Sequence, residues 1–424
     1  MDHSRPMLQP DFLDDDLWTI LDDHAPGARP AADMAKDEPS LWPPAPAEAP
    51  PSFLTTLPSA PTAGVGPLSL PIHPTGGSLS KPVFRHDGLL VVGSEASAAD
   101  AAGTQHGLFV TNFRAPDSSF LALPQAVRDL QWVQSHAVAL AVGKDIQLLR
   151  VGHEAADCQL QGARILECGR QPRVAPITMT HSDLIRELAV SPLEPRHVLS
   201  GGFDETVCMT DVEVGDVLLK FDARDVVSSL RWVPDGGHQH HVSWTTDGGA
   251  FSIADTRIKS AAGQLHLPSP SLLRFDVTGG LFSHEFTSAH HVVLAYEHGY
   301  LAFLDTRMLP RPSACHMLCK APLATLGEVR RSLCSDFALF GYGGFVVADL
   351  SQTTTPEARC VVCVVSSGAT PTLRREFAPV GMDQRKTSGD FAVDNVNLLA
   401  VSDSAGIVAI YDMQTLRSHD TFSL

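Results

Sequence analysis

Residues 181–211 read HSDLIRELAVSPLEPRHVLSGGFDETVCMTD, a segment in which short apolar runs alternate with turn residues. The apolar runs lie at 185–190, 197–200 and 207–211, and Gly-Gly-Phe-Asp at 201–204 separates the last two. Gly and Asp readily supply the positive φ angles that a tight turn between antiparallel strands needs. The segment therefore predicts three strands, the last two of which form a hairpin.

The same arrangement recurs along the chain from about residue 84 onward. An apolar strand ending in Asp occurs five times, with spacings of 44, 50, 44 and 63 residues, at 207–211, 251–255, 301–305, 345–349 and 408–412. A turn cluster and an earlier apolar strand precede each copy, and the earlier strands lie at 197–200, 241–244, 291–294, 337–340 and 398–401. A further strand, apolar at its first, fourth and sixth positions, precedes some of the units, at 127–132, 185–190 and 227–232. Four strands that repeat about every 45 residues are typical of a propeller blade.

Two weaker units come first and bring the number of units to seven, at 89–93 with 107–110 and at 137–140 with 145–149. The sequence thus predicts an all-β fold, a seven-bladed β-propeller of four-stranded antiparallel blades that spans residues 81–424. One sheet cannot bury both of its faces alone, so blades pack face to face around a ring. Ring closure is expected to use a terminal strand, with 81–85 and 420–424 as the two candidates.

These residues resemble the WD-repeat family over roughly 81–424. The third unit carries the best match, with His181, Ser191-Pro192, Ser200, Gly201-Gly202, Asp204 and Asp211. The resemblance implies a buried structural hydrogen-bond network that contains His181, Ser200 and Asp204. Thr210 stands where that family usually has Trp, and the other units lack most of the set.

The first 80 residues have a different composition from the rest of the chain. They contain 15 of the 31 prolines and 11 acidic against 3 basic residues. Such a segment cannot bury enough apolar surface to offset its ordering entropy. Residues 1–80 are therefore predicted to be a disordered, acidic, Pro/Ala-rich tail.

One acidic-aromatic motif, at 11–23, stands out within this tail. It places apolar residues among six Asp residues, and a partner is expected to bind Asp15, Asp16, Leu17, Trp18 and Leu21. The motif is similar to the short signal that ubiquitin-like autophagy modifiers bind by strand addition. An activation segment that folds as an amphipathic helix on a coactivator is an alternative, and an inert solubilising tail is another.

The tripeptide Asp-Thr-Arg occurs in two successive units, at Asp255–Arg257 and at Asp305–Arg307. It is similar to the box through which some WD-repeat proteins dock on the adaptor of cullin-based ubiquitin ligases, although the aromatic residue of that box is missing here. The resemblance implies partner contacts by Asp255, Arg257, Asp305 and Arg307, because Arg offers a bidentate fork. The alternative is a salt bridge at the strand end within each blade.

Other chemically active residue types form no recognisable site. Cys360-Val-Val-Cys363 lies among valines, and Cys315 and Cys319 have no partner motif, so these are predicted to be core cysteines. The histidines at 238–241 and 290–291 lie at strand entries. No phosphate loop or nucleophile elbow is present. We therefore predict no enzyme, no metal and no cofactor.

Composition restricts the class of partner. A net charge of −17 argues against a general nucleic-acid binder, no run approaches the length of a membrane span, and a signal peptide is not evident. Eight cysteines in 424 residues suggest a reducing compartment, the cytoplasm or nucleus. We expect a non-catalytic scaffold or adaptor that binds several proteins in one complex, without a small-molecule substrate, and whose tail recruits a partner.

Three alternatives remain open at this point. The first is a substrate receptor of a cullin-type ubiquitin ligase, which the paired Asp-Thr-Arg tripeptides suggest. The second is an autophagy-linked adaptor that binds a ubiquitin-like modifier through Trp18–Leu21. The third is an enzyme that uses the central channel of the ring, for which the sequence offers no metal site or acidic cluster.

Overall fold

The computed structural model describes residues 79–85, 88–94, 106–112, 115–134, 136–150, 180–234, 240–259, 261–268, 279–309, 311, 315–320, 326–331, 336–341, 344–349, 373–377, 387–392, 398–404, 406–412 and 417–423. The chain divides into two units, Met1–Val65 and Gly66–Leu424, and all described residues belong to the second. The predicted domain boundary after residue 80 therefore lies inside the second unit. The acidic-aromatic motif at 11–23 lies outside the described residues.

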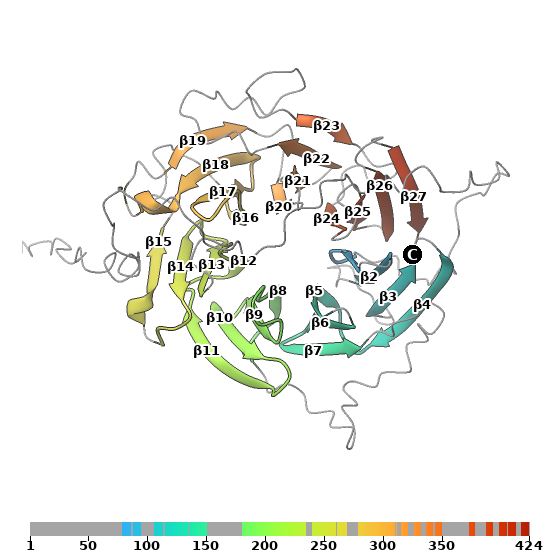
Figure 1. Ribbon diagram of the computed structural model, residues 1–424, viewed down its shortest axis with the longest axis horizontal. Helices are drawn as coiled ribbons and strands as arrows, with labels where there is room; N and C mark the ends of the chain where they lie inside the picture. Colours follow the sequence, from blue (N-terminus) through green and yellow to red (C-terminus); the bar gives the residue numbers. More distant parts are fainter. Residues whose placement is uncertain are drawn as a thin grey trace, which may run out of the picture. The chain divides into compact units, whose positions relative to one another are not determined.

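The described residues form seven antiparallel sheets, each built from consecutive strands (Figure 1). The first three sheets comprise β1 (Val83–Phe84), β2 (Leu89–Gly93), β3 (His106–Asn112) and β4 (Ala115–Leu123); β5 (Val127–Gln134), β6 (Ala137–Val142) and β7 (Asp145–Arg150); and β8 (Ile185–Val190), β9 (His197–Gly202), β10 (Thr206–Asp211) and β11 (Asp216–Asp222). The second sheet is the only three-stranded one among the described residues, and residues 151–179 after it are outside them.

The remaining four sheets have four strands each. They comprise β12 (Val227–Trp232), β13 (His241–Thr246), β14 (Phe251–Asp255) and β15 (Gln264–Leu267); β16 (Leu281–Phe286), β17 (His291–Tyr296), β18 (Tyr300–Asp305) and β19 (Cys315–Lys320); β20 (Leu326–Arg331), β21 (Asp336–Gly341), β22 (Gly344–Asp349) and β23 (Leu373–Phe377); and β24 (Thr387–Phe391), β25 (Leu398–Asp403), β26 (Ile407–Asp412) and β27 (Arg417–Ser423). Two short 3₁₀ helices, η2 (Ala261–Gly263) and η3 (Thr306–Met308), follow β14 and β18. Neither these nor any other helix in the described part of the chain is long and apolar enough to cross a membrane.

The prediction of an all-β fold is confirmed, and every apolar segment assigned to a strand lies within an observed strand. The second strands are among the most buried elements of the described residues. All residues of β6, β13 and β25 are buried, whereas the outer strand β11 is mostly exposed. Strands covered on both faces read as continuous apolar runs, and strands with one wet face alternate. This difference explains why the second and third strands were the easiest to recognise.

Each sheet packs against the next through its inner strands, which lie toward the centre in Figure 1. The contacts run from β2 to β5, then through β8, β12, β16 and β20 to β24, which contacts β1. Apolar clusters fill the spaces between sheets, and one of them joins Phe84, Leu90 and Val92 to Leu398, Val408 and Ile410. The seven sheets therefore form a closed cycle of contacts.

The sequence led us to expect that a terminal strand closes the ring by pairing with the sheet at the other end of the chain. The cycle does not close in this way. Both candidate strands pair with their own sequence neighbours, β1 with β2 and β27 with β26. Instead, the chain before β1 bonds to the last sheet. Leu79 N donates to Asp403 O at 3.1 Å, and Ser402 Oγ donates to Ser80 O at 2.8 Å.

A repeated side-chain hydrogen bond joins four successive pairs of sheets. The third residue of one inner strand accepts a hydrogen bond from the backbone N–H of the fourth residue of the next inner strand. The bonds, written donor to acceptor, are Leu188 to Asp129 (2.8 Å), Leu230 to Glu187 (2.9 Å), His284 to Ser229 (3.1 Å) and Val329 to Ser283 (3.1 Å). We call these bonds the inter-sheet stitches. They satisfy buried backbone donors that have no strand partner on that side.

Candidate functional site

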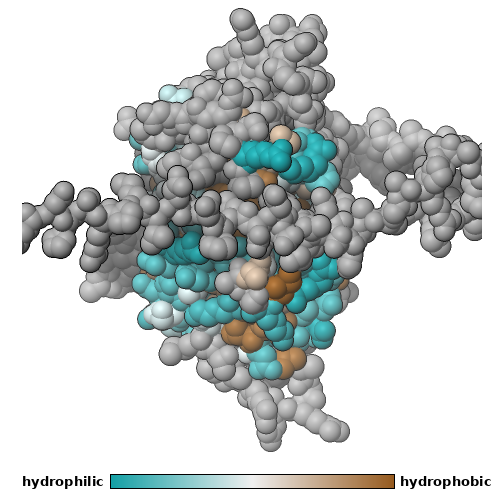
Figure 2. Space-filling model, turned by 90° about the vertical axis from the view of Figure 1, so that its left-hand side faces the viewer, coloured by the Kyte–Doolittle hydropathy of each residue, from teal (hydrophilic) through white to brown (hydrophobic). Residues whose placement is uncertain are grey.

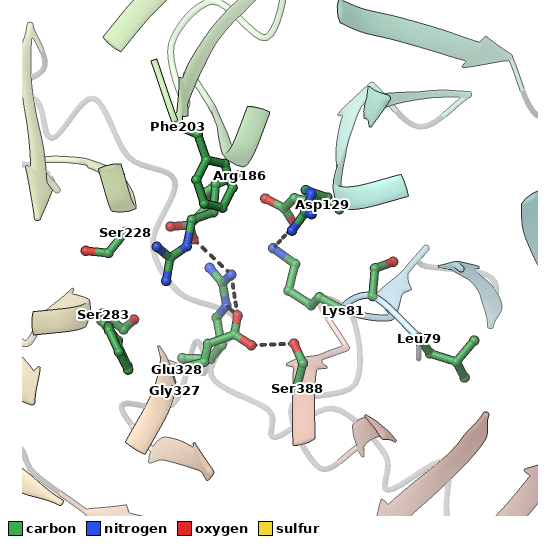
Figure 3. A pocket seen from close by; sticks show the side chains of 15 residues that line it. Leu79, Lys81, Asp129, Arg186, Phe203, Ser228, Ser283, Gly327, Glu328 and Ser388 are labelled. Carbon is green, nitrogen blue, oxygen red and sulfur yellow. Dashed lines mark hydrogen bonds and ion pairs between the residues drawn. The ribbon is translucent and has the colours of Figure 1, made fainter. Parts of the chain in front are cut away.

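Five inner strands carry a register irregularity at their second residue. The irregular positions are Arg128, Arg186, Ser228, Phe282 and Gly327. A bulge re-aims side chains and interrupts regular alternation. All five residues line one cavity of about 320 Å³, and so do the residues that follow four of them. We call this cavity the central pocket (Figure 3).

A buried network of ion pairs forms the inner wall of the central pocket. Lys81 Nζ lies 3.0 Å from Asp129 Oδ1, and both side chains are almost fully buried. Glu187 Oε1 accepts from Arg231 at 2.7 Å and from Arg330 at 3.1 Å. Burial alone would raise the pKa of Glu187, but Arg231 and Arg330 outweigh it, and that pKa is lowered. Glu187 is therefore held ionised.

The network continues to the last sheet through Glu328. Arg330 donates from Nε to Glu328 Oε1 at 2.5 Å, and the other oxygen of Glu328 accepts from Ser388 Oγ. Asp390, two residues beyond Ser388, has its pKa raised to about 6, chiefly by burial and only partly offset by Lys81 and Arg330. Burial also raises the pKa of Asp129 despite its ion pair with Lys81. For Asp129 and Asp390, burial therefore outweighs the attraction of the nearby cations.

Two arginines lie at the rim of the pocket against aromatic rings. The Arg186 guanidinium carbon is 5.9 Å from the Phe203 ring centroid and 5.7 Å from that of Phe282. Its Nη1 donates to both oxygens of Asp247, at 2.6 and 2.7 Å. Arg128 lies over the same Phe203 ring at 5.3 Å. The rings and Asp247 fix the direction of the Arg186 side chain.

The structure brings His181, Ser200 and Asp204 together in the third sheet. His181 Nδ1 lies 2.8 Å from Asp204 Oδ1, and its Nε2 lies 2.8 Å from Ser200 Oγ. A carboxylate only accepts, so Nδ1 carries the proton and Nε2 accepts from the serine. Burial lowers the pKa of His181 although Asp204 acts in the opposite direction. The neutral His181 therefore stabilises the turn between β9 and β10 by its bonds to Ser200 and Asp204.

Thr210, at the position where the resemblance to the WD-repeat family places Trp, does not join this network. Thr210 is fully buried, and its hydroxyl oxygen has no hydrogen-bond partner. Thr206, four residues earlier, joins the network instead. Its Oγ1 donates to Asp204 Oδ1 at 2.8 Å and lies 3.2 Å from His181 Nδ1. Thr206 is a network residue that the sequence analysis missed.

The two Asp-Thr-Arg tripeptides adopt the same local geometry. In each, the Asp Oδ1 accepts from the backbone N and from Nε of the Arg two residues later, at 2.9 and 3.0 Å for Arg257 and at 3.0 and 3.0 Å for Arg307. The Arg Nη2 reaches the other oxygen, at 2.6 Å to Asp255 and 2.7 Å to Asp305. Each guanidinium therefore forms a bidentate ion pair with the carboxylate at the end of the preceding strand.

Comparison of the sequence with protein-family models and with curated protein sequences finds no match. The interpretation of the site therefore depends on its geometry. Among the described residues, no group of three or more His, Cys, Asp or Glu side chains could hold a metal ion. Cys315 is buried, whereas Cys360 and Cys363 lie outside the described residues, as do Asp15, Asp16, Leu17, Trp18 and Leu21 of the tail.

The residues of the central pocket were present in the sequence analysis only as strand residues. One feature of the sequence could have indicated the pocket. Two inner strands carry Arg followed by an acid at their second and third positions, at Arg128-Asp129 and Arg186-Glu187. The meaning of this feature depends on the bulges, because regular alternation would send the two side chains to opposite faces. Lys81 gave no signal, since it precedes the first strand.

Proposed function

We propose that the chain is a seven-bladed β-propeller of the WD-repeat type that serves as a non-catalytic scaffold or adaptor in a multiprotein complex. The acidic tail recruits one partner and the propeller binds others. The closed cycle of seven sheets and the inter-sheet stitches support the propeller assignment. A ring of this kind presents many strand ends and outer strands to solvent, which suits simultaneous binding of several proteins.

The observation that carries the proposal is the outer strand β11 and the turn before it. Val214, Val217 and Leu218 are exposed by 67%, 39% and 38%. No described strand pairs with the outer edge of β11. Exposed apolar residues on an edge strand favour contact with another protein. β11 lies at the lower left in Figure 1, and Figure 2 shows the molecule from that left-hand side. Brown, apolar residues lie among teal ones in the lower part of this view.

The ubiquitin-ligase alternative gains less support from the geometry. Arg257 and Arg307 are about half exposed, at 49% and 59% of the side chain. Both guanidinium groups are already engaged by Asp255 and Asp305, however, so a docking partner would have to compete with an intact ion pair. The same fork in both copies supports the strand-end salt bridge as their role.

The proposal is tested by affinity purification and mass spectrometry from the native cell with three baits and one control bait, each of which carries residues 1–424. One bait is the wild type, one carries Trp18→Ala with Leu21→Ala, and one carries Val214→Ser, Val217→Thr and Leu218→Thr. We expect each variant to lose a different subset of partners. Asp216→Asn with Lys220→Gln, both exposed on β11, is the matched control and should lose none. Recovery of the same proteins by all baits would refute both binding surfaces.

A further inference from the structure

We propose that the central pocket binds a small oxyanion group, the carboxylate or phosphate of a ligand that enters between Lys81, Arg128 and Arg186. This inference goes beyond the scaffold function and does not depend on it. It adds a ligand that the sequence analysis did not predict.

The composition of the pocket wall favours an anionic occupant. Four basic side chains line it, Lys81, Arg128, Arg186 and Arg330, against three acidic ones, Asp129, Glu187 and Glu328. Its volume of about 320 Å³ is in the range that small ligands or a few side-chain groups fill. Hydroxyl groups of Ser228, Ser283 and Ser388 add to its polar lining (Figure 3).

Lys81 offers hydrogen-bond donors that its surroundings do not satisfy. The residue is only 4% exposed, and Nζ lies 3.0 Å from Asp129 Oδ1, but the geometry of this ion pair is not that of a hydrogen bond. The ammonium therefore has no hydrogen-bond partner in the described structure. The other oxygen of Asp129 is occupied by Leu188 N. An ammonium carries three donors, and a buried donor without an acceptor is costly. An oxyanion supplies the missing acceptors.

Arg186 supplies a second set of donors with a fixed direction. Among the described residues, only its Nη1 hydrogen-bonds, to Asp247, which leaves the donors on Nε and Nη2. Its guanidinium packs on Phe203 and Phe282, and its side chain remains 26% exposed. A guanidinium edge held in one orientation matches the geometry of carboxylate and phosphate oxygens.

A cationic occupant fits the same wall less well. Glu187 already accepts from Leu230 N, Arg231 and Arg330. Glu328 accepts from Arg330 and Ser388. Both oxygens of Glu187 and of Glu328 thus accept hydrogen bonds, whereas Lys81 and Arg186 retain donors. Because the unused hydrogen-bonding groups of the pocket are donors on cations, the ligand is expected to carry a negative charge.

The test uses the full-length chain and two probes, inorganic phosphate followed by ³¹P NMR line broadening and N-acetylglutamate amide followed by saturation-transfer-difference NMR. At least one probe should bind at millimolar concentration. A tenfold preference for phosphate indicates a phosphate-bearing ligand, and the reverse indicates an acidic side chain of a partner protein. Comparable binding of both supports the site for either source.

Two pocket variants and one control decide the location of binding. Arg186→Met, and the paired change Lys81→Met with Asp129→Asn, should each weaken the better probe at least tenfold. The paired change removes both charges together, so it avoids leaving a buried carboxylate alone. Arg257→Met, at an exposed ion pair outside the pocket, should leave binding unchanged. Binding of neither probe, or binding that survives both pocket variants, would overturn the proposal.

Discussion

Asp390 provides a quantitative test of how strongly burial between the sheets disfavours a charged carboxylate. The side chain lies on β24 and lines a second cavity together with Arg231, Glu285 and Arg330. Burial, aided by Glu328 and opposed by Lys81 and Arg330, raises its pKa from 3.8 to about 6. A raised folded-state pKa means that the ionised carboxylate disfavours the folded state. The change Asp390→Asn is therefore expected to stabilise the protein at neutral pH.

The magnitude follows from the two pKa values. The difference between 3.8 and about 6 corresponds to about 3 kcal/mol. The penalty is absent below pH 3.8, where both states of the wild type bind the proton, and it grows until the pH exceeds the folded-state pKa. The advantage of Asp390→Asn should thus be about 3 kcal/mol at pH 7.5 and about half of that at pH 5.

Equilibrium urea unfolding of the wild type and Asp390→Asn at both pH values measures this difference. Asp216→Asn on the exposed strand β11 serves as the control and should change the free energy of unfolding by less than about 0.5 kcal/mol at either pH. The reasoning is wrong if Asp390→Asn destabilises the protein at pH 7.5. It is also wrong if its effect is the same at pH 5, because a pH-independent effect cannot arise from ionisation of Asp390.

The remaining predictions concern one buried histidine and one close backbone approach. Burial, with Arg231 and Arg330, holds the pKa of His284 well below 6.5, so only the unfolded state takes up this proton as the pH falls. The destabilisation caused by His284→Gln should therefore shrink between pH 7.5 and 5.5 in urea unfolding, and a constant difference would contradict it. A Cβ at Gly202 would overlap the Leu184 carbonyl oxygen, whereas one at Gly327 would meet only a carbonyl oxygen at 3.9 Å. Gly202→Ala should therefore lower the free energy of unfolding by about 1–3 kcal/mol, with Gly327→Ala close to neutral, and equal effects of the two would show that the overlap is relieved without cost.

The strands could be predicted because their signal is local. Apolar runs such as 197–202 and 207–211 carry the pattern of strands covered on both faces, and turn residues separate them. The bonding of His181 with Ser200 and Asp204 was expected from the resemblance to the WD-repeat family, and these residues lie close in sequence. These interactions depend on one hairpin and the segment before it. A single repeat unit contains the information that positions them.

The central pocket could not be predicted in the same way because it is made between units. Arg330 lies 143 residues from Glu187, and Lys81 lies 48 residues before Asp129. Which residues of two inner strands meet depends on the bulges, and a bulge is a property of strand pairing and not of one strand's sequence. The role of Thr206 in the third sheet could not be predicted for a similar reason. Thr206, and not Thr210, contacts His181 and Asp204, because its hydroxyl group lies within hydrogen-bond distance of them.

The four inter-sheet stitches show that joining the sheets does not itself require charge. Two of the acceptors are carboxylates, Asp129 and Glu187, but Ser229 and Ser283 make the same bond with a neutral hydroxyl. A buried carboxylate costs more to desolvate than a hydroxyl and must be matched by a cation. The acids at two of four equivalent positions therefore need a further reason. They hold Lys81, Arg231 and Arg330 at the centre of the ring, and a cation held there with unused donors is what an anionic ligand requires.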